Sequence, residues 1–194
     1  MSAQPVIDRA ALEVGRAINI RNAIVAVFCG CGPAAVLALL HPPRPMMWII
    51  GLAAGFLWAN LFEYSLHRWI LHVPSTYAFE GHLLHHASIG MPHEPLYVNL
   101  GGKAIHVVMM FAGNGAPVVA ADGLLHRSFA PGVLVSFSLY FILTEEIHWR
   151  FHMGGWLPSW LDGARARHMA HHDRPDRDYA IFWSLFDRLF GTAS

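Results

Sequence analysis

The chain has 194 residues, of which 55% are hydrophobic and only 13% are charged. Soluble domains carry about 25% charged residues, so this composition excludes an ordinary soluble domain and favours a protein that sits in lipid. Thirteen Lys/Arg balance thirteen Asp/Glu, and the resulting zero net charge gives no basic surface for a nucleic-acid partner.

The N-terminal segment, residues 1–22, is predicted to form a surface helix. Charges of both signs are spread along it before any apolar core, which is not the pattern of a cleaved signal peptide. Its apolar residues have a partly amphipathic spacing, which permits a helix lying at the membrane interface.

Four apolar segments follow, and each is a candidate membrane span. A bilayer core of about 30 Å needs roughly 20 helical residues. The segments that approach this length are 23–40, 46–62, 104–121 and 129–144. The proline-rich stretch 41–45 turns the first two into a hairpin, and the third has the weakest pattern because it contains His106 and Asn114. Gly51 and Gly55 form a small-xxx-small pair, which either permits close helix packing or arises by chance.

Ten of the fourteen histidines fall into four tight clusters. The clusters are His67 and His72; His82, His85 and His86; His148 and His152; and His168, His171 and His172. Neutral imidazole is a common ligand of first-row transition metals, and ten nitrogens exceed the roughly four to six that one ion takes. The sequence therefore predicts two metal ions that share about five nitrogens each.

The spacing within the clusters suits a helical metal site. Positions i, i+3 and i+4 share a helix face, so the triplets that begin at His82 and His168 are each expected to aim into one cavity. The two residues of the third cluster stand one turn apart. His67 and His72 are five residues apart and cannot face one point from an ideal helix, so a bend, a π-bulge or two different metals is expected there.

Carboxylates beside the clusters are candidate partners for the second ring nitrogen of each ligand. Glu63, Glu146 and Asp178 are predicted to play this role. The alternative is that lipid headgroups solvate these charges, or that Arg68 and Arg150 neutralise them.

Counting spans predicts which side of the membrane the histidines occupy. The first two clusters follow the second span and the last two follow the fourth, so all four lie on one side. The N-terminus and eleven of the thirteen Lys/Arg lie on that side too, and only Arg44 and Arg127 fall in the opposite loops. This bias predicts that the histidine clusters are cytoplasmic.

The histidine motifs resemble the histidine boxes of a known superfamily. The stretch Glu63-Tyr64-Ser65-Leu66-His67-Arg68 through His72, HxxHH at His82, HxxxH at His148 and HxxHH at His168 are similar to those of the fatty acid hydroxylase/sterol desaturase superfamily of integral-membrane non-haem diiron oxygenases. The tail 179–192 resembles the superfamily's C-terminal signature. It departs from the usual Asn-aromatic-Gly start, because this chain has Asp178-Tyr179-Ala180.

This resemblance implies an all-α integral membrane fold with about four transmembrane helices and a cytoplasmic helical cap that holds a dinuclear metal site. The expected organisation is a single domain, 1–194, made of the surface segment 1–22, the transmembrane hairpins with the first two clusters, 23–147, and the cap with the last two clusters, 148–194. The ten clustered histidines would bind two iron ions, which zinc can replace in purified protein, with O2 as co-substrate. No catalytic side chain is expected beyond the metal centre.

The implied activity is O2-dependent hydroxylation of a lipid C–H bond, with a fatty acyl chain or a sphingolipid as the favoured substrate. A sterol or carotenoid hydroxylase or desaturase with the same metal core is the alternative. A metal transporter or metal-binding membrane protein is a more distant one, because the clusters lie beyond the ends of the spans. The segment before the first span is too short for a haem-binding donor, so a separate electron-donor protein is expected on the cytoplasmic face. The small size favours a bacterial inner membrane over the endoplasmic reticulum.

Overall fold

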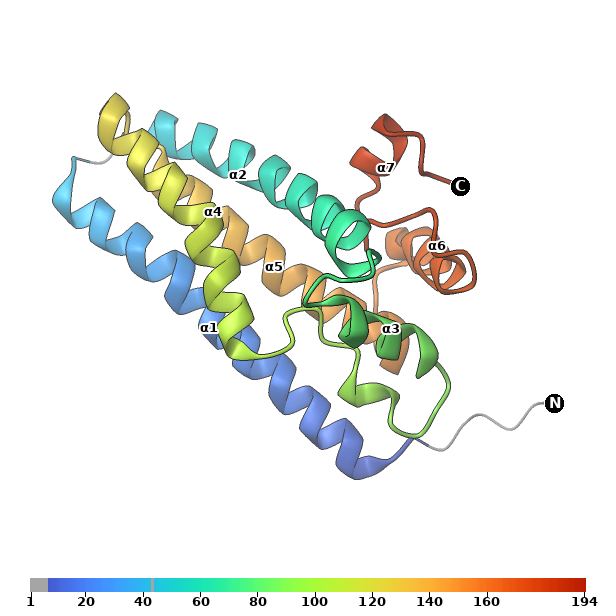
Figure 1. Cartoon of the computed structure of the whole chain (residues 1–194). Helices are drawn as coiled ribbons and strands as arrows, with labels where there is room; N and C mark the ends of the chain where they lie inside the picture. Colours follow the sequence, from blue (N-terminus) through green and yellow to red (C-terminus); the bar gives the residue numbers. More distant parts are fainter. Residues whose placement is uncertain (1–6, 43) are drawn as a thin grey trace. The chain divides into compact units, whose positions relative to one another are not determined.

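The regular elements of the structure, a computed structural model that describes residues 7–42 and 44–194, are all helical (Figure 1). In chain order they are α1 (Arg9–Leu40), α2 (Pro45–Leu66), the π-helix η1 (His67–Leu71), α3 (Phe79–Ala87), the 3-10 turn η2 (Glu94–Leu96), α4 (Ala104–Leu125), α5 (Ala130–Met153), the 3-10 turn η3 (Ser159–Leu161), α6 (Asp162–Asp173) and α7 (Leu185–Leu189). The predicted all-α fold class is confirmed.

Four of these helices are long and apolar enough to cross a membrane: α1, α2 with η1, α4 and α5. They correspond to the four predicted spans, so the protein is an integral membrane protein. One difference concerns the N-terminus. The predicted surface helix and the first span form one continuous helix from Arg9 to Leu40, because no proline separates them, and residues 1–6 lie outside the described part.

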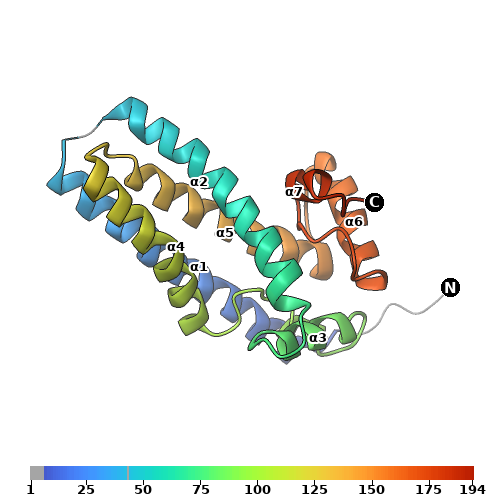
Figure 2. The same cartoon turned by 45° about the horizontal axis from the view of Figure 1, so that its top comes forward.

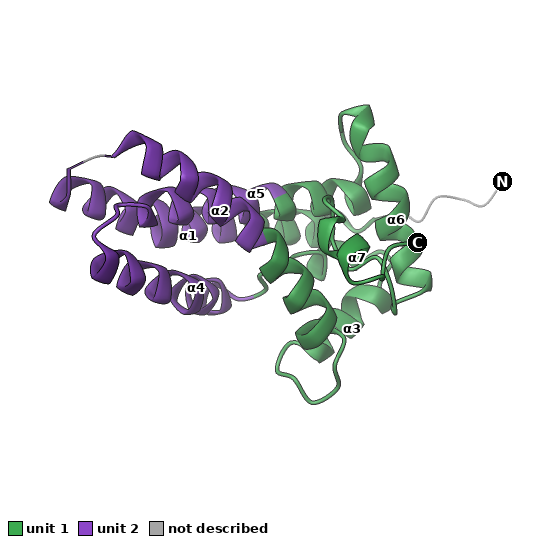
Figure 3. Cartoon of the chain, turned by 90° about the horizontal axis from the view of Figure 1, so that it is seen from above, with its two compact units in different colours: residues 1–19, 60–102, 144–194 green, residues 20–59, 103–143 purple. Residues whose placement is uncertain are grey.

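The chain divides into two compact units (Figure 3). Unit 1 comprises 1–19, 60–102 and 144–194, and unit 2 comprises 20–59 and 103–143. Within unit 2, the segments of α1, α2, α4 and α5 run side by side (Figures 1 and 2).

Close helix packing in unit 2 depends on glycines. A Cβ atom at Gly51 would overlap the backbone carbonyl of Phe129, and one at Gly55 would come within 2.7 Å of the Cα of Val133. Both contacts bring α2 against α5. The small-xxx-small pair therefore serves helix packing, because only a residue without a side chain permits this approach.

Polar groups inside unit 2 are paired with one another. The Trp58 indole N–H donates to the Asn114 side-chain oxygen at 2.9 Å, and the Asn114 amide donates to the Met110 carbonyl at 2.8 Å. Ser138 donates to the carbonyl of Ala26 at 2.9 Å. The two bonds of Asn114 explain how the candidate span α4 tolerates this polar side chain.

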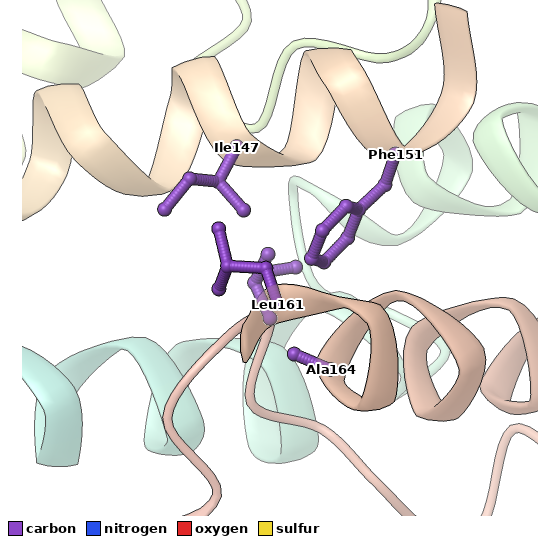
Figure 4. Close-up of a cluster of buried hydrophobic side chains, with 5 residues drawn as sticks. Ile147, Phe151, Leu161 and Ala164 are labelled. Atoms are coloured by element: carbon purple, nitrogen blue, oxygen red, sulfur yellow. The ribbon is translucent and has the colours of Figure 1, made fainter. Parts of the chain in front are cut away.

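A buried apolar cluster in unit 1 packs α6 and η3 against α5. Ile147 and Phe151 project from α5 toward Leu161 and Ala164, and Ile181 of the tail completes the cluster (Figure 4). All five side chains are at most 9% exposed. This packing fixes α6, which carries the last histidine cluster.

Candidate metal centre

The ten clustered histidines converge within unit 1 as two groups of five. Group A contains His67, His72, His82, His86 and His171, and group B contains His85, His148, His152, His168 and His172. In each group, one ring nitrogen per residue lies within 4.8 Å of all the others. Each group therefore has the number and spacing of nitrogens needed to surround one metal ion.

Each histidine triplet is divided between the two groups. In α3, His82 and His86 join group A and His85 joins group B. In α6 the assignment is reversed, because His171 joins group A while the other two residues join group B. The expectation that a triplet aims into one cavity is corrected here. Residues i+3 and i+4 are neighbours in sequence and point about 100° apart around a helix, so they diverge to different groups.

The unusual spacing of the first cluster is explained by the π-helix η1. His67 begins this helix and His72 immediately follows it. In a π-helix residues five apart are nearly aligned, and the two rings stack with centroids 5.0 Å apart. Of the three expectations for this pair, the π-helix is confirmed, and both residues join the same group.

The ring nitrogens approach one another as closely as ligands of one ion do. His82 Nε2 lies 3.1 Å from the Nε2 atoms of His67 and His86 and 3.0 Å from that of His72. In group B the Nε2 of His168 lies 2.9 Å from that of His152. With metal–nitrogen bonds of about 2.1 Å, two ligands at right angles are about 3.0 Å apart. The residues thus fit a metal with more than four ligands better than a tetrahedral one.

Burial favours the neutral, metal-binding form of four imidazoles outside the candidate spans, those of His72, His85, His86 and His168. Desolvation, together with the nearby His171, lowers the pKa of His72 to about 3 and that of His86 to about 4. Desolvation also holds the pKa of His85 and His168 well below its ordinary value. Both ring nitrogens of His85 are buried without a hydrogen-bond partner in the described part of the chain, as expected for a ligand whose partner is a cation.

The second ring nitrogen of three of these histidines faces a protein acceptor. His171 Nδ1–H donates to the Arg177 carbonyl at 2.6 Å, and His67 Nδ1 contacts the Tyr179 carbonyl. His152 Nδ1–H donates to a carboxylate oxygen of Glu94 at 2.9 Å. These bonds select the tautomer whose Nε2 lone pair points into the group.

Glu94 was not found from the sequence. It is 4% exposed, and its second oxygen accepts the Gly90 N–H at 2.8 Å. It lies 58 residues from His152 in the chain and outside every cluster, so no local signal identifies it.

Two buried carboxylates hold the tail segment that carries the Tyr179 carbonyl. Glu63 accepts the Ile181 N–H at 2.7 Å. Asp187 accepts the N–H groups of Tyr179 and Ala180, each at 2.9 Å, and is fully buried. Glu63 was predicted to partner the second ring nitrogen of a ligand; it accepts from the tail backbone, and its role toward a metal stays a prediction. Asp187 was missed, although a single acid in the apolar stretch 181–190 is a usable signal for a buried carboxylate.

The other two predicted carboxylates have different partners. Asp178, at φ 55°, accepts the Ser194 N–H at 3.0 Å. Asp and Asn tolerate this left-handed conformation better than most residues, which suits the position where the superfamily has asparagine. Glu146 accepts from Arg16 at 2.5 Å and from Arg150 at 2.7 Å. Its partners are arginines, and it ties α1 to α5 within unit 1.

Comparisons with known proteins point to one family. A family model described as fatty acid hydroxylase matches residues 52–192. The chain is 28% identical over 150 residues to the dihydroceramide fatty acyl 2-hydroxylase FAH2 of Arabidopsis thaliana, covering 74% of this chain and 61% of that protein. It is 25% identical over 144 residues to the dihydroceramide fatty acyl 2-hydroxylase FAH1 of the same organism, covering 71% of this chain and 57% of that protein. The chain thus spans about three fifths of the length of these relatives.

A solved structure shares the fold. The visible hydroxylase domain of full-length scs7p superposes with a TM-score of 0.60 at 18% identity, covering 98% of this chain and 68% of that one. The family match covers well over half of the chain and includes all ten histidines of groups A and B. The chain belongs to the fatty acid hydroxylase family.

Proposed function

We propose that this protein is a membrane-bound, O2-dependent hydroxylase of fatty acyl chains that works with two iron ions. The observation that carries the proposal is the convergence of ten imidazoles into two groups of five. The net reaction converts a C–H bond and O2, with two electrons and two protons, into an alcohol and water.

Group A would hold one ion and group B the other. When bound, iron supplies O2 binding and the oxidising power to cleave an unactivated C–H bond. Nitrogen-only groups support a redox-active first-row metal, and neither Cys29 nor Cys31 belongs to them. Zinc found after purification would not contradict iron, because nitrogen sites bind zinc more strongly than ferrous iron.

The protein's own residues fix the ligands and keep water away. Glu94 and the carbonyls of Arg177 and Tyr179 orient three imidazoles before any metal binds. Burial of the histidines limits solvent access to the centre, which protects a reactive oxidant from side reactions.

The relatives support an acyl substrate. Both are named as acyl 2-hydroxylases of dihydroceramide, so we place the reaction at carbon 2 of an acyl chain, ahead of a sterol or carotenoid. We further propose that a separate electron-donor protein supplies the two electrons at the cytoplasmic face of a bacterial inner membrane.

Lipid analysis of expressing cells tests this function. Cells with the wild-type protein should accumulate 2-hydroxy acyl chains, measured by mass spectrometry after hydrolysis. His171→Ala removes a group A ligand and should abolish them, whereas His93→Ala, which lies outside both groups, should not. Equal amounts of oxygenated lipid in wild-type and His171→Ala cells would reject the proposal.

A further inference from the structure

Two adjoining cavities lie between α1 and α4 in unit 2. One is an apolar groove of about 560 Å³, and the other is a pocket of about 360 Å³ whose lining includes charged side chains. Val119 of α4 lines both cavities. Each volume is within the roughly 300–1,000 Å³ of known small-molecule sites.

The groove is walled by uncharged side chains. Cys29 and Pro33 line it from α1, and Ala112, Gly115 and Ala116 line it from α4. Because small residues face it along α4, the groove has room for a slender apolar chain. Both helices are candidate membrane spans, so the material available at this depth is lipid acyl chain.

The pocket at the end of the groove carries a cation. Arg44 lines it together with His41, Asp122 and His126. Arg44 Nη1 donates to the His126 carbonyl at 3.0 Å, which anchors the guanidinium and leaves its other N–H groups available. A guanidinium held this way is a good donor to phosphate oxygens.

The carboxylate in the pocket is bonded to donors other than Arg44. The two oxygens of Asp122 accept the N–H groups of Phe129 at 3.2 Å and Ala130 at 3.1 Å. Asp122 therefore pairs with the start of α5, where a negative charge is favourable. No ion pair joins it to Arg44 among the described residues.

We propose that these two cavities form one binding site for a phospholipid, with an acyl chain in the groove and the phosphate on Arg44. The shape and the order of the two cavities match an amphiphile of this kind: apolar along the span and cationic at the hairpin loops. The site lies wholly in unit 2 and does not depend on the metal chemistry.

Native mass spectrometry on the full chain, purified in detergent and stripped of lipid, tests the site. Dioleoylphosphatidylethanolamine should bind with one molecule per chain. Arg44→Gln removes the phosphate donor and should weaken binding by about tenfold, the loss expected for one charged hydrogen bond. Ala116→Phe fills the groove, so the acyl chain is excluded from it and binding should fall by about as much. Dioleoylglycerol, which lacks the phosphate, and inorganic phosphate, which lacks the chains, should each bind at least about tenfold more weakly than the phospholipid.

Two matched variants serve as controls. Arg127→Gln removes the other basic residue of the hairpin loops, and Met109→Phe enlarges an exposed α4 residue outside the groove, so both should bind like wild type. The proposal is overturned if either Arg44→Gln or Ala116→Phe folds and binds like wild type, if Arg127→Gln loses as much binding as Arg44→Gln, or if dioleoylglycerol binds as tightly as the phospholipid. The two ends of the site are tested separately, so one variant that fails to fold leaves the other decisive.

Discussion

At the scale of single residues, His67, His152 and His171 are each held at two atoms. Their Nε2 atoms lie among the other ligand nitrogens, and their Nδ1 atoms face a carbonyl or a carboxylate. The acceptors are themselves fixed, since Asp187 receives the N–H of Tyr179 and Glu94 receives that of Gly90. The orientation of these three imidazoles is therefore set by groups that lie outside the two histidine groups.

Asp187→Asn tests this support. An amide keeps one acceptor but presents N–H to one of the two backbone N–H groups, so a hydrogen bond worth about 1.5–3 kcal/mol is lost. We expect a lower Tm and a metal affinity reduced by about 10-fold to 100-fold, measured by cobalt titration. Asp162→Asn, at an exposed position of α6, is the control and should change neither. A metal affinity of Asp187→Asn equal to that of the wild type would show that the bonds between Asp187 and the tail backbone do not position the ligands.

The lowered pKa values of the histidines predict how the metal-free protein responds to acid. The unfolded chain takes up protons below the ordinary histidine pKa of about 6.5, whereas folded His86 and His72 resist protonation until about 4 and about 3. The free energy of unfolding should therefore fall as the pH drops from about 6.5 toward 4. Thermal unfolding of chelator-treated protein at several pH values measures it, and a Tm that holds steady or rises below pH 6 would contradict the prediction.

At the scale of elements, close backbone contacts position the groups that orient the ligands. A Cβ atom at Gly15 of α1 would overlap the Pro95 carbonyl, next to Glu94. The side chain of Asn99 also donates to the Gly15 carbonyl at 3.1 Å. The N-terminal part of α1 thus holds the segment that presents Glu94 to His152.

Gly15→Leu should displace that segment. Overpacking of this kind costs about 1–3 kcal/mol, and the loss of Glu94 support should weaken metal binding to group B. The matched control is Gly32→Leu on the same helix, where an added Cβ meets nothing within 4 Å. Metal content and Tm distinguish the two variants. If Gly15→Leu retains both values, the contact has no role in shaping the site.

Local sequence signals predict some features of these elements and miss others. Apolar length predicted the four spans, and cluster spacing predicted that the histidines gather, because both signals are local. The division of α3 and α6 between the two groups was missed because the spacing was taken to place each triplet on one face, whereas residues i+3 and i+4 point about 100° apart around a helix. Glu94 and Asp187 were missed because their partners are set by tertiary packing and not by neighbours in the chain.

At the scale of the whole molecule, all ten histidines belong to unit 1, although they come from α3, α5, α6 and the region around η1. The four candidate spans explain how distant segments return to one side, because a complete hairpin separates the second cluster from the third. The positive charge on that side predicts a cytoplasmic centre.

Cysteine labelling tests this orientation. In a chain with Cys29→Ser and Cys31→Ser, a membrane-impermeant maleimide applied to intact bacterial cells should label Arg127→Cys. It should label Ser159→Cys, at an exposed position after α5, only once the cells are lysed. The reverse pattern would place the histidines outside the cytoplasm.

The metal content of the purified protein distinguishes two bound ions from one. Protein expressed with ample iron should contain two metal ions per chain by elemental analysis. His82→Ala in group A and His168→Ala in group B should each lower the content to about one, because each group surrounds its own ion. A single ion in the wild-type chain, or two ions retained in both variants, would contradict an account built on two five-histidine sites.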